Sequence, residues 1–326
     1  MELIEKPQPG GTELTQRHIK LVENALLASR APATRRAYAG AIKRFTEWSA
    51  ANGNHTPLPA DPRSVAAWLV TLAADDGLSM STITIACSAL KAWHLDGGHR
   101  DVTRHRGIVQ TLAGLRRELG TAPRKKARAF DVPELRRLLN ALDTDSNSGR
   151  RDRALMLLSF ASGMRRSEVV ALKRSDLQLS ASGIRITIRR SKTDQVGAGV
   201  EIAVVAGSNP ATCPVRSMRT WLGVRGGGPE DAVFTRVTRG DVILKTTQLS
   251  GQSVSLILKA TAAKAGVEVE HLSGHSYRAS HITEAAAAGV PLERIARTTR
   301  HSSSVILGYI RSANLMEETS AASLGL

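Results

Sequence analysis

Four short segments in the second half of the chain carry side chains suited to reaction at a phosphodiester bond. Breaking and rejoining that bond without a metal ion or ATP requires a nucleophile that stores the bond energy, cations around the non-bridging oxygens, and acids and bases for the bridging oxygens. The side chains of these types are, in chain order, Arg165, Glu168, Lys192, His275, Arg278, His301 and Tyr309. Together they supply each kind of group that such a reaction needs.

The first segment pairs an arginine with a carboxylate. Arg165 and Glu168 are three residues apart, so on one face of a helix the carboxylate can orient the guanidinium toward a phosphate. Arg166 is a second candidate for the arginine, but the spacing to Glu168 favours Arg165. An Arg and a Glu at this spacing more often form a surface ion pair, so the segment alone is a weak signal.

Lys192 lies near the tip of a predicted β-hairpin. Alternating apolar residues predict one strand over residues 184–189 and a second over residues 200–204, with glycines between them. A lysine on a short hairpin can reach into a groove and give a proton to a leaving 5′ hydroxyl. A solvated lysine is the commoner role at such a position.

The last two segments bring histidine, arginine and tyrosine toward the C-terminal end. His275 and Arg278 share one face of a predicted helix, where the imidazole offers a base or a hydrogen-bond donor and the guanidinium a bidentate phosphate contact. His301 precedes Tyr309, one of three tyrosines in the chain. In isolation Tyr309 would be an ordinary half-buried helical tyrosine.

The ordered set resembles the catalytic domain of the tyrosine recombinase and phage integrase superfamily, which carries Arg, Lys, His-x-x-Arg, His and Tyr in that order. All six positions are filled, and the likeness covers residues from about 130 to 311. The helical first half is similar to the family's core-binding domain. Each of the four segments alone has an ordinary structural explanation, but their occurrence together in the family's order favours the catalytic interpretation.

The resemblance implies how the phosphate is held. Arg165 and Arg278 would clamp the scissile phosphate and stabilise its pentacoordinate transition state, with Glu168 supporting Arg165. His301 would hydrogen-bond a non-bridging oxygen.

The resemblance also implies the course of the reaction. Tyr309 would attack the phosphate to give a 3′ phosphotyrosine and a free 5′ hydroxyl. Lys192 would protonate the leaving 5′ oxygen, and His275 is similar to the residue that accepts the tyrosine proton. The hydroxyl of a partner strand would then reverse the step, so no cofactor, metal ion or ATP is expected.

Two positions depart from the family's pattern. Ala279 stands where many members have a second histidine, and His281 is expected to serve in helix packing. The family's common Leu-Gly-His reads Thr299-Arg300-His301 in this chain. Arg300 therefore replaces a glycine, which bears on the local turn and on phosphate contacts.

Two domains are expected to position these groups. Residues 14–119 repeat apolar residues at helical spacing, which predicts an all-helical DNA-binding domain with a core of aromatic residues, after a disordered leader at residues 1–13. Residues 120–129 combine Gly, Pro and cations, which is typical of an exposed linker. The linker cations expected to contact DNA phosphates are Arg124, Lys125, Lys126 and Arg128.

The remainder is expected to form a mixed α/β catalytic domain over residues 130–311. Residues 312–326 resemble tails that dock on a neighbouring protomer, although a frayed terminus is the alternative. The predicted fold is thus mainly α with a small β-sheet, arranged as a two-domain C-shaped clamp.

Composition agrees with an anionic partner. The net charge of +16 and the pI near 10.7 favour nucleic acid, because the basic residues recur along the whole chain instead of gathering in one membrane-binding segment. No apolar run is long enough to span a membrane, so a cytoplasmic, nucleoid-associated protein is expected. Cys87 and Cys213 lack metal-ligand spacing, so neither a disulfide framework nor a metal site is predicted.

The resemblance predicts a site-specific recombinase that acts on double-stranded DNA as a homotetramer holding two duplexes. Integration, excision, inversion and resolution all remain open, as do the target sequence and any accessory protein. Two other functions also remain open: a catalytically silent DNA-binding protein on the same scaffold, and a type IB topoisomerase.

Overall fold

The structure, a computed structural model, describes residues 14–122, 127–189 and 199–313. The chain divides into two compact units, Met1–Arg124 and Lys125–Leu326. Each unit has its own hydrophobic core, and the two are described separately.

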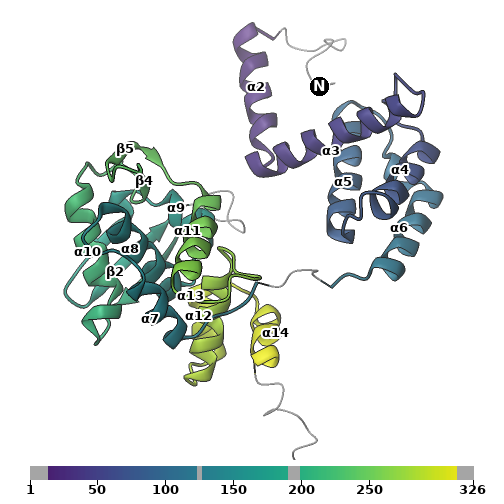
Figure 1. Ribbon diagram of the computed structural model, residues 1–326. Coiled ribbons are helices and arrows are strands. Elements are labelled where there is room, and N and C mark those ends of the chain that lie inside the picture. The colour runs from purple at the N-terminus through teal and green to yellow at the C-terminus, as the bar shows by residue number, and fades with distance from the viewer. Residues whose placement is uncertain (1–13, 123–126, 190–198, 314–326) are drawn as a thin grey trace, which may run out of the picture. The chain divides into compact units, whose positions relative to one another are not determined.

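The N-terminal unit is helical throughout its described residues (Figure 1). Its elements are α2 (Gln16–Ala28), α3 (Pro32–Ala51), α4 (Pro62–Ala74), α5 (Met80–Asp96), the 3₁₀ turn η1 (Val102–Arg104) and α6 (Arg106–Leu119). The start of α4 shows how the sequence sets these elements. Asp61 accepts hydrogen bonds from the N–H groups of Arg63 and Ser64, and Pro62 fixes the first turn.

Aromatic and aliphatic side chains from α3, α4, α5 and α6 form the core of this unit. The rings of Phe45 and Trp68 meet edge to face with centroids 5.0 Å apart, and both residues are buried. Leu69 and Leu90 complete the contact between helices. Phe45 and Trp68 are therefore part of the core, as expected from their helical spacing.

The C-terminal unit mixes helices with short strands (Figure 1). Its helices and 3₁₀ turns are α7 (Val132–Asn140), α8 (Asn147–Ser162), α9 (Arg166–Ala171), η2 (Arg174–Asp176), η3 (Pro210–Thr212), α10 (Pro214–Arg225), α11 (Gly251–Lys264), α12 (Ser276–Ala287), α13 (Leu292–Thr299) and α14 (Ser303–Ala313). Its strands are β1 (Leu177–Leu179), β2 (Gly183–Ile188), β3 (Val200–Val205), β4 (Thr235–Val237) and β5 (Ile243–Gln248).

The strands form two small antiparallel sheets, ordered β1-β2-β3 and β4-β5. In the first sheet Ile186 pairs with Ile202 and Ile184 with Val204, which places these four buried side chains on the core face. The predicted hairpin is confirmed. Strand β1 and the second sheet were not predicted. Strands β1 and β4 have only three residues each, too few to establish a period-two pattern, and β5 does not alternate apolar and polar residues.

Helix α8 lies at the centre of the main core of this unit. Leu155, Met156, Leu157 and Leu158 are consecutive and all buried, so α8 is covered around its whole circumference. Helices α10 and α12 pack against it. Because α8 is packed on all sides, its C-terminal end is held in place, and with it the start of the segment that follows.

The last three helices share a second, smaller core. Ile282 on α12, Ile295 on α13 and Ile306 on α14 are buried together and separate from the main core. We call this group the isoleucine cluster. It fixes the helix that carries Tyr309.

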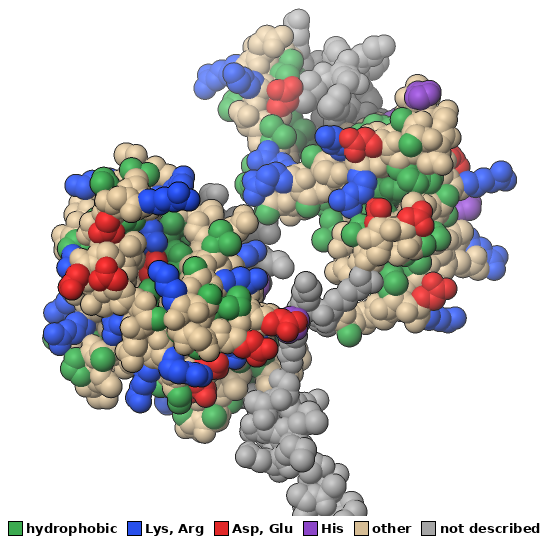
Figure 2. Space-filling view, viewed as in Figure 1, with side chains coloured by type: hydrophobic (Ala, Val, Ile, Leu, Met, Phe, Trp, Pro, Cys, Tyr) green, Lys and Arg blue, Asp and Glu red, His purple; other side chains and the backbone are tan. Residues whose placement is uncertain are grey.

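The expected fold class, mainly α with a small β-sheet, is confirmed, and the strands form two such sheets. Lys and Arg side chains are spread over the visible face of each unit, among scattered acidic side chains (Figure 2). Within the described ranges, no helix is both long enough and apolar enough to cross a bilayer. Nor do those ranges contain a group of three His, Cys, Asp or Glu side chains able to hold a metal ion.

Candidate active site

The turn between α8 and α9 presents Arg165. Helix α8 ends at Gly163, whose φ of 58° lies in the left-handed region that favours glycine. In the first turn of α9, Glu168 accepts hydrogen bonds from the backbone N–H and from Nη1 of Arg165, both at 2.8 Å. Because the Glu168 side chain is only 2% exposed, its carboxylate holds the guanidinium in one orientation.

Arg278 on α12 is held by three hydrogen bonds from its guanidinium. Nη1 donates to the carbonyl of Gly163 at 2.8 Å, Nη2 donates to the carbonyl of Thr299, and Nε donates to Nε2 of His301 at 3.0 Å. Burial, together with the charge of Arg165, lowers the pKa of Arg278 to about 10. The side chain therefore remains a cation at neutral pH.

The bond from Arg278 also fixes the protonation state of His301. A guanidinium N–H can only donate, so Nε2 of His301 accepts and the imidazole proton lies on Nδ1, 3.3 Å from Oγ1 of Thr299. Burial, then the charges of Arg278, Arg165 and Arg300, lower the pKa of His301 to about 4. His301 is therefore neutral at pH 7.

Tyr309 lies next to His301. The centroids of their rings are 6.2 Å apart and the ring planes are inclined by 44°. Tyr309 is partly buried on α14 and packs against the isoleucine cluster. The side chain of Tyr309 also raises the pKa of Arg278, although this effect is smaller than the lowering of that pKa by burial.

The structure thus brings five predicted residues into one group, which we call the arginine-histidine cluster. Its predicted members are Arg165, Glu168, Arg278, His301 and Tyr309. His275 is exposed at the N-terminus of α12, and its carbonyl accepts the N–H of Arg278 at 3.1 Å. Lys192 lies outside the described residues.

The neighbouring arginine, Arg166, points to a different partner. Its Nη1 lies 3.4 Å from Oγ of Ser255 on α11, and the residue is exposed. The contact with Glu168 therefore belongs to Arg165, the arginine that the spacing favoured. His281 packs as expected, with Nδ1 2.9 Å from the carbonyl of Phe160 on α8.

Of the linker cations, only Arg128 can be described. Its Nη1 donates to the carboxylate of Glu134 at 3.0 Å, its Nη2 to the carbonyl of Glu268 at 2.9 Å, and its backbone N–H to the carbonyl of His271. These contacts attach the start of the C-terminal unit to α7 and to the loop before α12. A phosphate contact by Arg128 stays a prediction, and Arg124, Lys125 and Lys126 lie outside the described residues.

Arg300 joins the cluster, although the sequence indicated only that it replaces a glycine and thereby bears on the local turn and on phosphate contacts. Its Nη2 donates to Glu168, so the same carboxylate contacts both Arg165 and Arg300. Arg300 ends α13 with a φ of 56°. No local pattern signals a contact between residues so far apart in the sequence.

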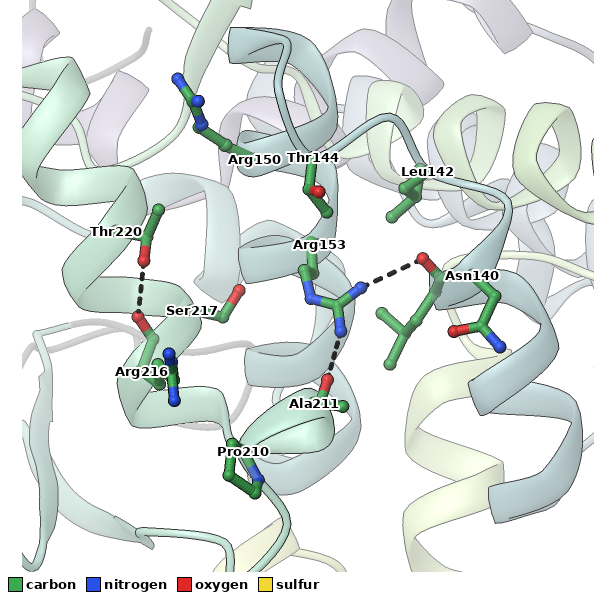
Figure 3. A pocket seen from close by; sticks show the side chains of 11 residues that line it. Asn140, Leu142, Thr144, Arg150, Arg153, Pro210, Ala211, Arg216, Ser217 and Thr220 are labelled. Atoms are coloured by element: carbon green, nitrogen blue, oxygen red, sulfur yellow. Dashed lines mark hydrogen bonds between the residues drawn. The ribbon is translucent and has the colours of Figure 1, made fainter.

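A separate cavity opens elsewhere on the C-terminal unit (Figure 3). It has a volume of about 520 Å³ and lies between α7, α8, η3 and α10. Arg153 crosses it and donates to the carbonyls of Leu139, at 3.1 Å, and Ala211. None of its lining residues belongs to the arginine-histidine cluster, so the chemistry of the cluster does not depend on this cavity.

Comparison with known families identifies the chain. The model of the phage integrase family matches residues 128–314, and the model of the phage integrase N-terminal SAM-like domain matches residues 23–95. The chain belongs to the phage integrase family. The resemblance seen in the ordered catalytic residues, and with it the expectation of a tyrosine recombinase, is confirmed.

Individual proteins of the family support this assignment. The integrase/recombinase xerD homolog of Selenomonas ruminantium is 33% identical over 298 residues, which cover 89% of this chain and 84% of that protein. Tyrosine recombinase XerC of Xanthomonas campestris pv. campestris is 30% identical over 254 residues, 76% of this chain and 69% of that protein.

Solved structures show that this integrase family member shares its fold with DNA-bound recombinases. A lambda integrase (75-356) dimer bound to a COC' core site superposes with a TM-score of 0.59 at 17% identity, covering 91% of this chain and 95% of that one. The XerH recombinase bound to a palindromic difH substrate gives a TM-score of 0.59 at 19% identity, covering 89% and 79%.

Proposed function

We propose that this phage integrase family member is an active site-specific recombinase, which cuts and rejoins DNA strands through a 3′ phosphotyrosine formed at Tyr309. The observation that carries the proposal is the arginine-histidine cluster. Two guanidiniums fixed by buried contacts lie with a neutral imidazole and a tyrosine from a separate helix. If Arg165 and Glu168 formed only a surface ion pair, and if Tyr309 served only in packing, these groups would not need to lie together.

The geometry supports a division of roles. Arg165 and Arg278 are cations with fixed orientation, suited to the charge that develops on the phosphate oxygens in the transition state. His301 is neutral and is suited to a hydrogen bond at a non-bridging oxygen. Tyr309 is the nucleophile.

Two further groups complete the proton transfers. Lys192, which lies between β2 and β3 in the sequence, protonates the leaving 5′ oxygen, and His275 at the start of α12 accepts the proton of Tyr309. Both roles follow the order of the residues in the family and belong to the proposal.

The proposed partner is a double-stranded DNA recombination site. The charge of +16 favours a polyanion, and the structural neighbours named above are recombinases bound to their DNA sites. We further propose that four copies act on two duplexes, with residues 312–326 docking on a neighbour, and that the linker cations contact phosphates. A DNA substrate of this kind supports our proposal that the protein is cytoplasmic and nucleoid-associated.

The experiment that tests the proposal is covalent trapping. Wild type and Tyr309→Phe are incubated with nicked duplexes that carry candidate sites from the DNA flanking the gene, and denaturant-resistant adducts are scored. Tyr38→Phe, a change in the N-terminal unit far from the cluster in sequence, is the matched control. We expect adducts from wild type and the control, and none from Tyr309→Phe.

The same assay separates the other functions. Gel shifts by all three proteins without any adduct would favour the silent DNA-binding protein. Adducts accompanied by relaxation of supercoils, without exchange between two sites, would favour a type IB topoisomerase.

A further inference from the structure

Arg300 occupies a backbone position that is unfavourable for an arginine. Its φ of 56° and ψ of 41° place it in the left-handed region at the end of α13, where a side chain crowds the backbone and glycine is favoured. A residue that occupies such a position against its intrinsic preference usually has contacts that stabilise it.

The contact that Arg300 makes is with the carboxylate that also holds Arg165. Glu168 accepts from Nη2 of Arg300 at one oxygen and from Nη1 of Arg165 at the other. The side chains of Arg300 and Glu168 are 11% and 2% exposed, so this is a buried interaction and not a surface ion pair.

The position of Arg300 changes the charge of the site. With glycine at position 300, one carboxylate would face two guanidiniums, those of Arg165 and Arg278. With arginine, the same carboxylate faces three. Since its negative charge is divided between two direct partners, Arg165 is less neutralised and presents more positive charge to a phosphate.

Two further observations place Arg300 within the field of the cluster. Its charge contributes to the lowered pKa of both Arg278 and His301. Its Nε and Nη1 are buried and have no hydrogen-bond partner among the described residues. Within those residues, Glu168 is therefore the group that holds the guanidinium in place.

We propose that Arg300 is a positioning residue for strand cleavage: it shares Glu168 with Arg165 and thereby raises the positive potential that the site offers to the scissile phosphate. In this role Arg300 acts through Glu168 and Arg165. The inference rests on the proposed function.

The test uses Arg300→Gly, which places the residue best suited to the left-handed backbone at this position and so should leave the fold intact. Arg300→Lys keeps the charge. Arg297→Ala removes an exposed cation from the same helix and is the matched control. Each full-length protein is assayed for DNA affinity by gel shift and for the rate of adduct formation on a nicked duplex at saturating DNA.

We expect Arg300→Gly to bind DNA as tightly as Arg297→Ala does, but to form adducts roughly tenfold more slowly or worse. Arg300→Lys should recover part of the rate. A rate for Arg300→Gly within about twofold of wild type would overturn the inference, as would an equal loss in Arg297→Ala. If wild type forms no adduct, the proposed function fails instead.

The dependence of the adduct-formation rate on pH gives a second test, because a purely structural role of Arg300 would leave the shape of this profile unchanged. The charged and polar groups that face His301 are Arg165, Glu168, Arg278, Thr299, Arg300 and Tyr309. Removing the cation at 300 raises the pKa of His301, so the acid limb of the Arg300→Gly profile should shift to higher pH than that of wild type. An unshifted limb counts against the inference.

Discussion

Three protein atoms fix the guanidinium of Arg278, and its planar geometry is what they recognise. Lysine keeps the charge but cannot reproduce the fork of donors. We expect Arg278→Lys to slow adduct formation by about 100-fold or more at saturating DNA while gel-shift affinity changes little. A variant that retains wild-type rates would show that charge alone suffices.

The adjacent arginines Arg165 and Arg166 form a matched pair for a second test. Arg165 contacts the buried Glu168, whereas Arg166 is exposed and lies near Ser255. Arg165→Ala should therefore reduce the adduct rate by about 100-fold or more, and Arg166→Ala by only a few-fold. The reverse ranking would assign the phosphate contact to Arg166.

His301 should make stability depend on pH. Its pKa is lowered from 6.5 to about 4 in the folded protein, mainly by burial, so between these values the unfolded chain binds more protons than the folded one. Stability contributed by neutral His301 is therefore complete above about pH 6.5 and is lost as the pH falls toward 4. Thermal unfolding midpoints measured across this range should fall more steeply for wild type than for His301→Gln. Parallel curves would contradict the lowered pKa.

At this scale the sequence predicted much of the site but not all of it. Arg165, Glu168, Arg278, His301 and Tyr309 were named because their types and order carry the chemistry. The contact between Arg300 and Glu168 was not predicted, since it joins distant segments and depends on how α13 ends. Only the folded chain reveals such a pair.

At the scale of secondary-structure elements, the backbone at the end of α8 contacts the site directly. Gly163 has a positive φ, and its carbonyl accepts from Arg278. A Cβ at this position would lie 3.0 Å from side-chain atoms of His281 and Thr299. Both the backbone conformation and the limited space around it therefore disfavour a side chain at Gly163.

Gly163→Ala should lower the free energy of unfolding by about 2–4 kcal/mol, which combines left-handed strain with overpacking. Gly266 is the control, because it also has a positive φ but a Cβ there would meet no atom within 4 Å. Gly266→Ala should cost about 1 kcal/mol, from strain alone. Denaturant unfolding measures both values, and equal losses would remove the packing argument.

Elements were predictable where a pattern repeats. Strands β2 and β3 alternate buried and exposed residues, so the hairpin was recognised. Strand β5 begins with adjacent Ile243 and Leu244 and continues with polar residues, and its pairing with β4 shifts register near Thr235. Such strands exist because the folded unit supplies their partners, which a local pattern cannot show.

For the whole molecule, charge governs the approach to DNA. A protein with a net charge of +16 that contacts about six or more phosphates should lose roughly a thousandfold in affinity between 50 and 200 mM salt. Gel shifts at several salt concentrations give the slope of log affinity against log salt. A shallow slope would mean few phosphate contacts and would argue against an extended DNA interface.

The isoleucine cluster separates the support of Tyr309 from the main core of the C-terminal unit. In evolutionary terms, the two can vary separately except on α12, which contributes Tyr277 to the main core and Ile282 to the isoleucine cluster. Substitutions at Ile282, Ile295 or Ile306 change how α14 holds the tyrosine, while the core around α8 continues to maintain the fold. Selection can therefore adjust how Tyr309 is held through three aliphatic side chains that pack around it and carry no reacting group themselves.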